Sequence, residues 1–186
     1  MELLAVYNEE GTQTGERVER TAAHRNGILH GASHTFIYRK QNGALQILLQ
    51  RRSPQKDSFP GCLDISSAGH VEAGMDFDDT AVKEIREELG LSVAPEALTP
   101  AFMQRYSSTD EFRGEIFRNE EIDRVYLLEA DPPLSGLRLQ EEEVSEVLWM
   151  DLREAQDRIR AGDKEICIDP EEMERVCRAI AENGKF

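Results

Sequence analysis

The chain lacks the long apolar segment that would cross a membrane. No run among its 186 residues approaches the roughly 18 consecutive apolar residues of a membrane span. Residues 1–6 also lack the basic start and long apolar stretch of a signal peptide. The sequence therefore predicts a cytoplasmic protein with no membrane partner.

Cysteines and cationic residues are also scarce. Cys62, Cys167 and Cys177 are an odd number without metal-type spacing, which indicates reduced thiols with a structural role. With 22 Lys and Arg against 37 Asp and Glu, the net charge is −15. We expect no nucleic-acid partner, because a basic patch would be needed to bind one.

Internal repeats and low-complexity linkers are missing as well. The 186 residues are enough for a sizeable core, and a hydrophobic content of 39% is ordinary for a globular protein. We expect one domain over residues 1–186.

The order of the predicted elements favours a mixed β-sheet with helices on its sides. Strands are expected at residues 3–8, 35–39, 45–50, 102–107, 124–128 and 144–150, with residues 62–68 leading into a helix. Asn42-Gly43 is a favoured hairpin dipeptide, and Pro100 is expected to break the chain before residue 102. Asp151 opens a helix, and Asp169 caps a final one at residues 170–182.

The strongest helical pattern covers residues 79–89. Apolar positions recur at three- and four-residue intervals, which predicts one buried stripe: Ala81, Val82, Ile85 and Leu89. Acidic residues suit the start of this helix, and Gly90 suits a left-handed end.

Three glutamates lie on the opposite side of the same helix. At about 100° per residue, Glu84, Glu87 and Glu88 form one acidic arc. A salt-bridged surface, with Lys83 and Arg86 among the acids, is the simplest explanation. However, acids in the last turn oppose the helix dipole, and Glu84 repels Glu88, so the arc also suggests a cation site.

Clustered carboxylates suit Mg²⁺ or Mn²⁺, which bind a few protein oxygens and keep positions for water and phosphate. A small-molecule diphosphate is the natural substrate for such a cation. The cation would neutralise phosphate charge and activate a water for attack at phosphorus.

Residues 69–91 resemble the signature of the Nudix hydrolases, of which the MutT-like pyrophosphatases are members. That signature reads Gly, five residues, Glu, seven residues, then Arg-Glu-hydrophobic-any-Glu-Glu-any-Gly-hydrophobic. The matching positions are Gly69, Glu84, Ile85, Glu87, Glu88, Gly90 and Leu91. Met75 replaces the first Glu and Lys83 replaces the Arg, and Asp76 is the candidate for the missing acid.

The resemblance implies a Nudix fold, an α/β/α sandwich with a mixed sheet, and it implies a site. Glu84, Glu87, Glu88 and the backbone carbonyl of Ala68 would bind the metal. Gly69, Lys83 and Gly90 would be structural positions of the motif.

The resemblance also implies a further carboxylate near residues 120–121. We choose Glu121 over Glu120 as a ligand or general base, with Glu84 as the rival base and an exposed loop as the alternative. Arg52 and Lys56, just after a strand, are candidates to hold the terminal phosphate, unless they are only solubilising charges.

A wider resemblance, over residues 3–130, is to isopentenyl diphosphate isomerases and the Nudix hydrolases closest to them. In the isomerases, residues at the places of His24, His30, His70 and a Glu near Glu121 hold a metal. Here each histidine is also open to a packing or surface role. The isomerases place a catalytic cysteine where this chain has Ala68, whose methyl cannot carry a proton.

The leading hypothesis is therefore a Mg²⁺- or Mn²⁺-dependent Nudix hydrolase that cleaves a diphosphate linkage in a nucleotide or another small organic molecule. The alternatives are an isomerase-like enzyme and a non-catalytic module that senses a nucleotide or metabolite. Trp149 and its hydrophobic neighbours belong either to the core or to an interface, so a homodimer stays open.

Overall fold

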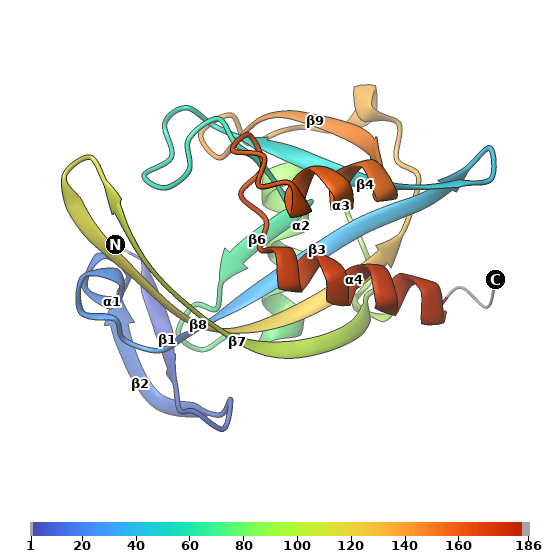
Figure 1. Ribbon diagram of the computed structural model, residues 1–186. Helices are drawn as coiled ribbons and strands as arrows, with labels where there is room; N and C mark the ends of the chain where they lie inside the picture. The colour runs from blue at the N-terminus through green and yellow to red at the C-terminus, as the bar shows by residue number, and fades with distance from the viewer. Residues whose placement is uncertain (1, 184–186) are drawn as a thin grey trace.

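Helices cover both faces of a mixed β-sheet in the computed structural model, which describes residues 2–183 (Figure 1). The strands are β1 (Leu3–Tyr7), β2 (Gln13–Glu19), β3 (His30–Gln41), β4 (Ala44–Arg52), β5 (Leu63–Asp64), β6 (Ser67–His70), β7 (Thr99–Phe112), β8 (Glu115–Glu129) and β9 (Val144–Asp151). The helices are α1 (Arg20–Asn26), α2 (Phe77–Leu89), α3 (Leu152–Arg160) and α4 (Pro170–Asn183), with 3-10 turns at Pro95–Ala97 and Leu134–Gly136. None of the helices within residues 2–183 is long and apolar enough to cross a membrane.

Strand β3 is the centre of the sheet. It runs antiparallel to β4 and β6 and parallel to β8, and β9 and β7 extend the sheet beyond β4 and β8. The parallel register places His30 opposite Glu121 and Ala32 opposite Asp123. Residues that are far apart in the sequence thereby share one end of the sheet.

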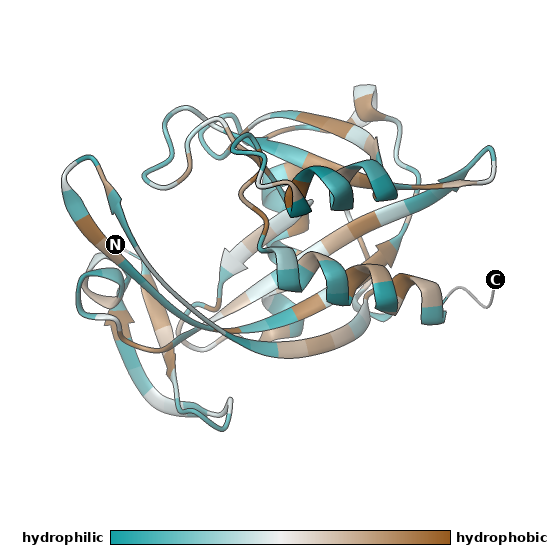
Figure 2. Ribbon diagram, viewed as in Figure 1, coloured by the Kyte–Doolittle hydropathy of each residue, from teal (hydrophilic) through white to brown (hydrophobic). Residues whose placement is uncertain are grey.

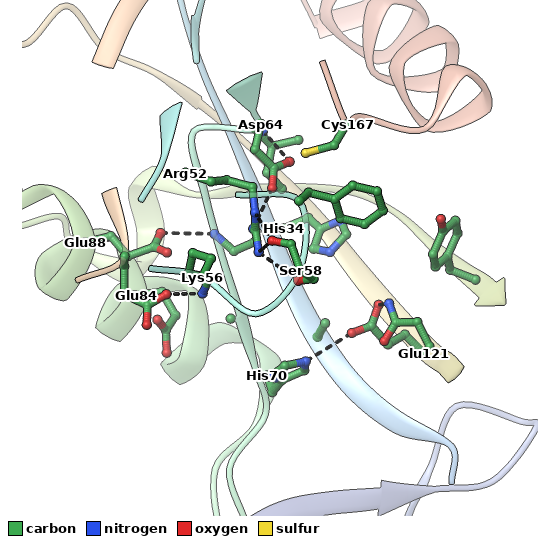
Figure 3. A pocket seen from close by; sticks show the side chains of 18 of the residues that line it. His34, Arg52, Lys56, Ser58, Asp64, His70, Glu84, Glu88, Glu121 and Cys167 are labelled. Atoms are coloured by element: carbon green, nitrogen blue, oxygen red, sulfur yellow. Dashed lines mark hydrogen bonds and ion pairs between the residues drawn. The ribbon is translucent and has the colours of Figure 1, made fainter. Parts of the chain in front are cut away.

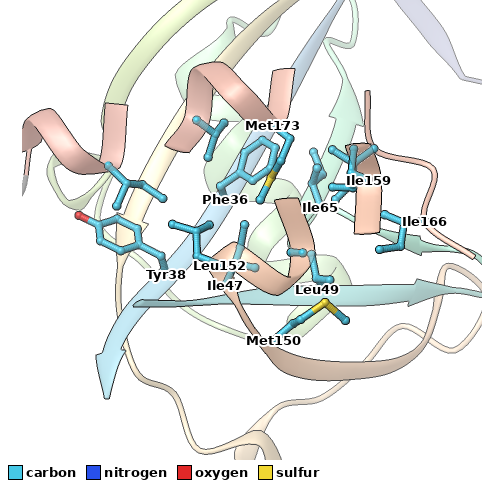
Figure 4. Close-up of a cluster of buried hydrophobic side chains, with 14 of the residues drawn as sticks. Phe36, Tyr38, Ile47, Leu49, Ile65, Met150, Leu152, Ile159, Ile166 and Met173 are labelled. Atoms are coloured by element: carbon cyan, nitrogen blue, oxygen red, sulfur yellow. The ribbon is translucent and has the colours of Figure 1, made fainter. Parts of the chain in front are cut away.

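The sheet separates two layers of core side chains. Phe36 and Leu49 face α3 and α4, whereas their neighbours Ile37 and Leu48 face α2, because successive strand residues point to opposite faces. Figure 4 shows the first layer, and Figure 2 shows hydrophilic residues spread over α3. The expected α/β/α arrangement with a mixed sheet is confirmed.

Trp149 belongs to the edge of the core on the α2 side. Its ring packs against that layer, and the Arg39 guanidinium carbon lies 4.2 Å from the ring centroid. An intramolecular role therefore accounts for this side chain.

Several local predictions are confirmed. Asn42 and Gly43 form the β3–β4 turn with φ of 51° and 82°, as this hairpin type requires. Helix α2 begins at Phe77, two residues before the predicted start, because the Asp76 side chain caps it by accepting from the Asp79 N–H. Gly90 ends the helix with φ of 66°.

Two predicted strands are longer than expected, and two elements were not predicted. Strands β7 and β8 form a hairpin much longer than the expected strands, and Pro100 lies inside β7, where the pairing register shifts. Strand β2 and helix α1 were not predicted. Both β2 and the outer part of the long hairpin are mostly exposed, so they carry little hydrophobic pattern.

Candidate active site

A cavity of about 340 Å³ lies between α2, β6, β8 and the loop after β4 (Figure 3). The segment that leads into α4 supplies a further wall. The structure brings most of the predicted site residues to this cavity: Arg52, Lys56, Ala68, Gly69, Lys83, Glu84, Glu87, Glu88 and Glu121. Gly90 does not line it and instead ends α2.

The packing of α2 against β6 sets the position of the glutamates. Ile85 and Leu89 are fully buried in the core, which turns Glu84 and Glu88 toward β6. A Cβ added to Gly69 would lie 2.7 Å from Oε1 of Glu84 and closer still to its Cδ, so any larger residue there would displace the Glu84 carboxylate. The Ala68 N–H donates to Oε2 of Glu88 at 3.2 Å.

Burial changes the acidity of two of these carboxyls. Glu88 is 4% exposed, and its burial raises its pKa to about 8. Burial also raises the pKa of Glu84, while the Lys83 ammonium lowers it. Glu87 is the more exposed member of the trio, since 43% of its side chain is accessible. The glutamates are therefore held at the wall of the cavity and do not form a freely solvated helix face.

Lys83 lies among these acids. Its Nζ is 2.8 Å from Glu84, 3.0 Å from Glu87 and 3.1 Å from Glu72. Burial alone would lower the pKa of Lys83, but the hydrogen bonds to the surrounding carboxylates raise it. The ammonium offsets part of the negative charge of the trio.

Glu72, and not Asp76, is the acid that supports Lys83. Met75 packs with the small cluster around Val71, and the carboxylate of Asp76 is used as the helix cap. The suggestion that Asp76 replaces the missing acid was wrong, because a capping side chain points back to its own helix.

The candidate phosphate-binding residues Arg52 and Lys56 line the cavity but already have partners. Arg52 donates to Oδ2 of Asp64 at 2.9 Å and to the Ser58 carbonyl at 3.0 Å. The Lys56 ammonium forms an ion pair with Glu143. A phosphate in this cavity would meet an oriented guanidinium and an ammonium that exchanges one anionic partner for another.

His24, His30 and His70 come together, as the wider resemblance implies. One ring nitrogen from each lies within 4.8 Å of the others. The Ile28 carbonyl lies 2.7 Å from Nδ1 of His30, which turns Nε2 toward the cluster. That Nε2 atom and both ring nitrogens of His24 are buried without a hydrogen-bond partner within residues 2–183. Burial lowers the pKa of His24 to about 3, so its ring is neutral and suited to metal ligation.

Glu121 faces this three-histidine cluster. Its Oε1 is 3.3 Å from Nε2 of His70 and 3.5 Å from Nε2 of His30. Burial would raise the pKa of Glu121, but the neighbouring His30 and His70 imidazoles hold it well below the usual range. Glu120 points elsewhere and pairs with Arg105 and Ser107, so Glu121 is the one of the two that lines the cavity.

The NUDIX domain family model matches residues 29–168, which is most of the chain. The chain belongs to this family.

Curated proteins extend the assignment of this Nudix chain. Nudix hydrolase 3 of Arabidopsis thaliana is 39% identical over 153 residues, which are 80% of the chain and 19% of that protein. The chain thus spans about a fifth of that relative's length. Isopentenyl-diphosphate Delta-isomerase of Shigella flexneri is 33% identical over 153 residues, which are 81% of the chain and 78% of the enzyme. The predicted Nudix family with isomerase-like relatives is confirmed, and the matches support a Nudix pyrophosphohydrolase.

Solved structures show the shared fold. DR0079 from Deinococcus radiodurans has a TM-score of 0.67 at 24% identity, over 96% of this chain and 99% of that one. The NUDIX domain of Shewanella oneidensis NrtR, complexed with ADP ribose, has a TM-score of 0.58 at 13% identity, over 81% and 87%. The predicted Nudix fold is thereby confirmed.

Four residues at the Nudix cavity were not predicted as site residues from the sequence. His34, Glu172 and Cys167 line it, and Glu72 completes the surroundings of Lys83. His34 lies between Ser33 and Thr35 in β3, so it does not stand out as an isolated polar residue. Glu172 and Cys167 carried no pattern either, since they reach the cavity from the segment around the start of α4.

Proposed function

We propose that this Nudix chain hydrolyses a diphosphate linkage in a nucleotide or another small organic diphosphate, with Mg²⁺ or Mn²⁺ as cofactor. The observation that carries the proposal is that three carboxylates from α2 line the same cavity as Arg52 and Lys56. Oxygen donors of this kind fit a hard divalent cation, and the cations across the cavity fit phosphate oxygens.

Glu84, Glu87, Glu88 and the Ala68 backbone would hold the cation. When bound, a divalent cation supplies neutralisation of phosphate charge and lowers the pKa of a coordinated water. Glu88 is fixed by the Ala68 N–H, and Lys83 keeps Glu84 and Glu87 close together in spite of their repulsion.

The remaining residues would bind and orient the substrate and its nucleophile. Arg52 and Lys56 would hold the terminal phosphate in line with an attacking water. Glu84 or Glu121 would accept the proton of that water as its oxygen attacks phosphorus and the bridging P–O bond breaks. Glu121 is ionised at neutral pH, which a base requires.

A screen for phosphate release tests the proposal and identifies the substrate. Nucleoside diphosphates and triphosphates, sugar nucleotides, dinucleotides, and prenyl and thiamine diphosphates would be incubated with Mg²⁺ and with Mn²⁺. ADP ribose is a natural member of the panel, since the NrtR NUDIX domain was solved with it. Binding without hydrolysis across the panel would instead favour a sensing module.

The matched variants are Glu87→Gln and Glu96→Gln. Glu87→Gln removes one proposed ligand charge and should lower turnover by orders of magnitude while the protein stays folded. Glu96 lies in an exposed 3-10 turn outside the cavity, so Glu96→Gln should keep wild-type turnover. Equal activity of the two variants would contradict the assignment of the site.

Isomerase-like chemistry is the second candidate, because Cys167 lines the same cavity although Ala68 replaces the cysteine of the isomerases. Incubation with isopentenyl diphosphate, metal and reductant separates the two. A shifted double bond without phosphate release, lost in Cys167→Ala, would favour the isomerase. Phosphate release that survives in Cys167→Ala would favour the hydrolase.

The cellular setting follows from the same features. We infer that residues 1–186 act as one Nudix domain in the cytoplasm, where the three free cysteines stay reduced. The acidic charge disfavours a nucleic-acid partner. A homodimer is compatible with this function, and light scattering would detect it.

A further inference from the structure

A second group of metal-type side chains adjoins the three-histidine cluster. One ring nitrogen of His34 and one carboxylate oxygen each of Glu121 and Asp123 lie within 4.8 Å of one another. Glu121 and Asp123 are alternate residues of β8, so they share one face of the strand, and His34 projects from the adjacent parallel strand β3. None of these three positions belongs to the signature helix.

The orientation of His34 suits a metal ligand. Its Nδ1 lies 2.7 Å from Oε1 of Glu172 in the first turn of α4, where the Asp169 cap fixes the helix start. This bond leaves Nε2 as the nitrogen for a further partner. A ligating histidine characteristically gives its other ring nitrogen to a carboxylate in this way.

Asp123 gives an independent sign that a partner belongs here. The residue is completely buried; Oδ2 accepts from the Gln104 side chain at 3.1 Å, whereas Oδ1 has no hydrogen-bond partner within residues 2–183. A buried carboxylate oxygen without a partner is destabilising, and a bound cation would satisfy it.

The charges around His34 are mainly negative. Glu172, Glu121 and Asp123 all act on it, and Arg175 reaches this region only through the Gln104 side chain, at 3.4 Å. His30 and His70 lie beside Glu121, but within residues 2–183 Glu172 pairs only with His34 and Asp123 forms no salt bridge. A divalent cation would add positive charge between these carboxylates.

We propose that His34, Glu121 and Asp123 bind a divalent cation at a site separate from the α2 glutamates and from the three-histidine cluster. Glu121 is shared with that cluster. One imidazole and two carboxylates form a mixed donor set that favours Mn²⁺ or Zn²⁺ over Mg²⁺. The ion has a route from solvent, because His34, Glu121 and Glu172 line the open cavity (Figure 3).

Counting bound Mn²⁺ tests this site without any activity measurement. The full chain in a Glu87→Gln background would be stripped with chelator and titrated with Mn²⁺, and the bound ion counted by electron paramagnetic resonance and elemental analysis. His34→Asn and Asp123→Asn should each lower the count by one ion per chain, and the double variant should lower it no further. An unchanged count in both single variants would overturn the proposal.

His24→Asn separates the new site from the three-histidine cluster. If His24→Asn and His34→Asn remove the same single ion, so that combining them lowers the count no further, one ion serves both clusters and a separate site is refuted. An ion count that His24→Asn leaves unchanged supports the separate site. So does a count that falls by two ions when His24→Asn and His34→Asn are combined. The Glu87→Gln background has already lost a proposed ligand of α2. The result does not depend on hydrolysis, because the experiment counts bound ions.

The Glu172→Gln variant allows the site to be tested even if His34→Asn fails to fold. Gln keeps an acceptor for Nδ1 of His34, so the ion count should stay the same while Mn²⁺ affinity falls about tenfold. Circular dichroism of the metal-free proteins would verify the fold. Wild-type Mn²⁺ affinity in both Glu172→Gln and Asp123→Asn would refute the assignment even if His34→Asn failed to fold.

Discussion

The ammonium of Lys83 lies 2.8 Å from a carboxylate oxygen of Glu84 and 3.0 Å from one of Glu87. It stands where the Nudix signature has arginine. Two of the three glutamates proposed to bind the cation therefore share an internal counter-ion, which a metal would have to compete with or displace. We therefore expect Lys83 to tune metal binding as well as the position of the helix.

Lys83→Gln is expected to destabilise the metal-free protein and to strengthen its response to metal. Losing the ammonium leaves Glu84 and Glu87 to repel each other, so the melting temperature without metal should fall by about 2–4 °C for a loss of ~1 kcal/mol. Added Mn²⁺ should then raise the melting temperature more than in the wild type. Lys83→Arg keeps the charge and serves as the control. Equal shifts of the melting temperature on adding Mn²⁺ to the wild type, Lys83→Gln and Lys83→Arg would contradict a competition between Lys83 and the metal.

Gly69→Ala is expected to lower turnover at least about tenfold, because misplacing a catalytic group is costly. The new methyl would lie 2.7 Å from Oε1 of Glu84, which must swing away from its ligand position. Gly136→Ala is the control, since its methyl would meet only Pro133 at 3.5 Å. Steady-state kinetics with matched melting curves would show whether turnover or only stability responds.

Asp76→Ala is expected to lower the free energy of unfolding by about 1 kcal/mol, the usual effect of losing a helix cap, with turnover unchanged. Denaturant titration and kinetics on the same preparation would measure both. A turnover loss of tenfold or more with normal stability would mean that Asp76 acts in the site after all.

Chelation is expected to abolish hydrolysis, because the glutamates of α2 would otherwise repel the diphosphate. Strong chelator should stop phosphate release, and Mg²⁺ or Mn²⁺ should restore it. Turnover that persists in chelator without added metal would refute metal dependence.

Alkylation of the Cys167 and Cys177 thiols by iodoacetamide should be slow at pH 7.5, and it should leave hydrolysis intact. Burial raises the pKa of Cys177 to about 11, so about one thiol in three thousand is the reactive thiolate at that pH. Burial raises the pKa of Cys167 as well. Since the thiolate forms as pH rises, labelling of Cys177 by iodoacetamide should increase about tenfold per pH unit up to about 11, as mass spectrometry would show. Loss of turnover in step with Cys167 labelling at pH 7.5 would indicate thiol chemistry.

The signature helix was predictable because its information is local. The three- and four-residue apolar spacing, the acidic start and Gly90 lie within one short segment, and the structure places that helix at residues 77–89. The hairpin at Asn42-Gly43 and the Asp151 cap were predictable for the same reason.

The second group of ligands was not predictable, because it depends on strand register. Nothing in the sequence says that β8 returns parallel to β3, and only that pairing brings Asp123 close to His34. The partner of Lys83 was missed in a similar way, since Glu72 reaches it from the loop before the helix and Asp76 does not.

The parallel pairing of β3 with β8 also determines when a binding site first exists during folding. His30 and Glu121 face each other across strands that no tight turn connects, so nearly half the chain must be in place before they meet. Nascent or truncated chains that end before β8 would have no such pocket for a metal. Capture of an ion by the histidines together with Glu121 would thus report that β8 has paired with β3.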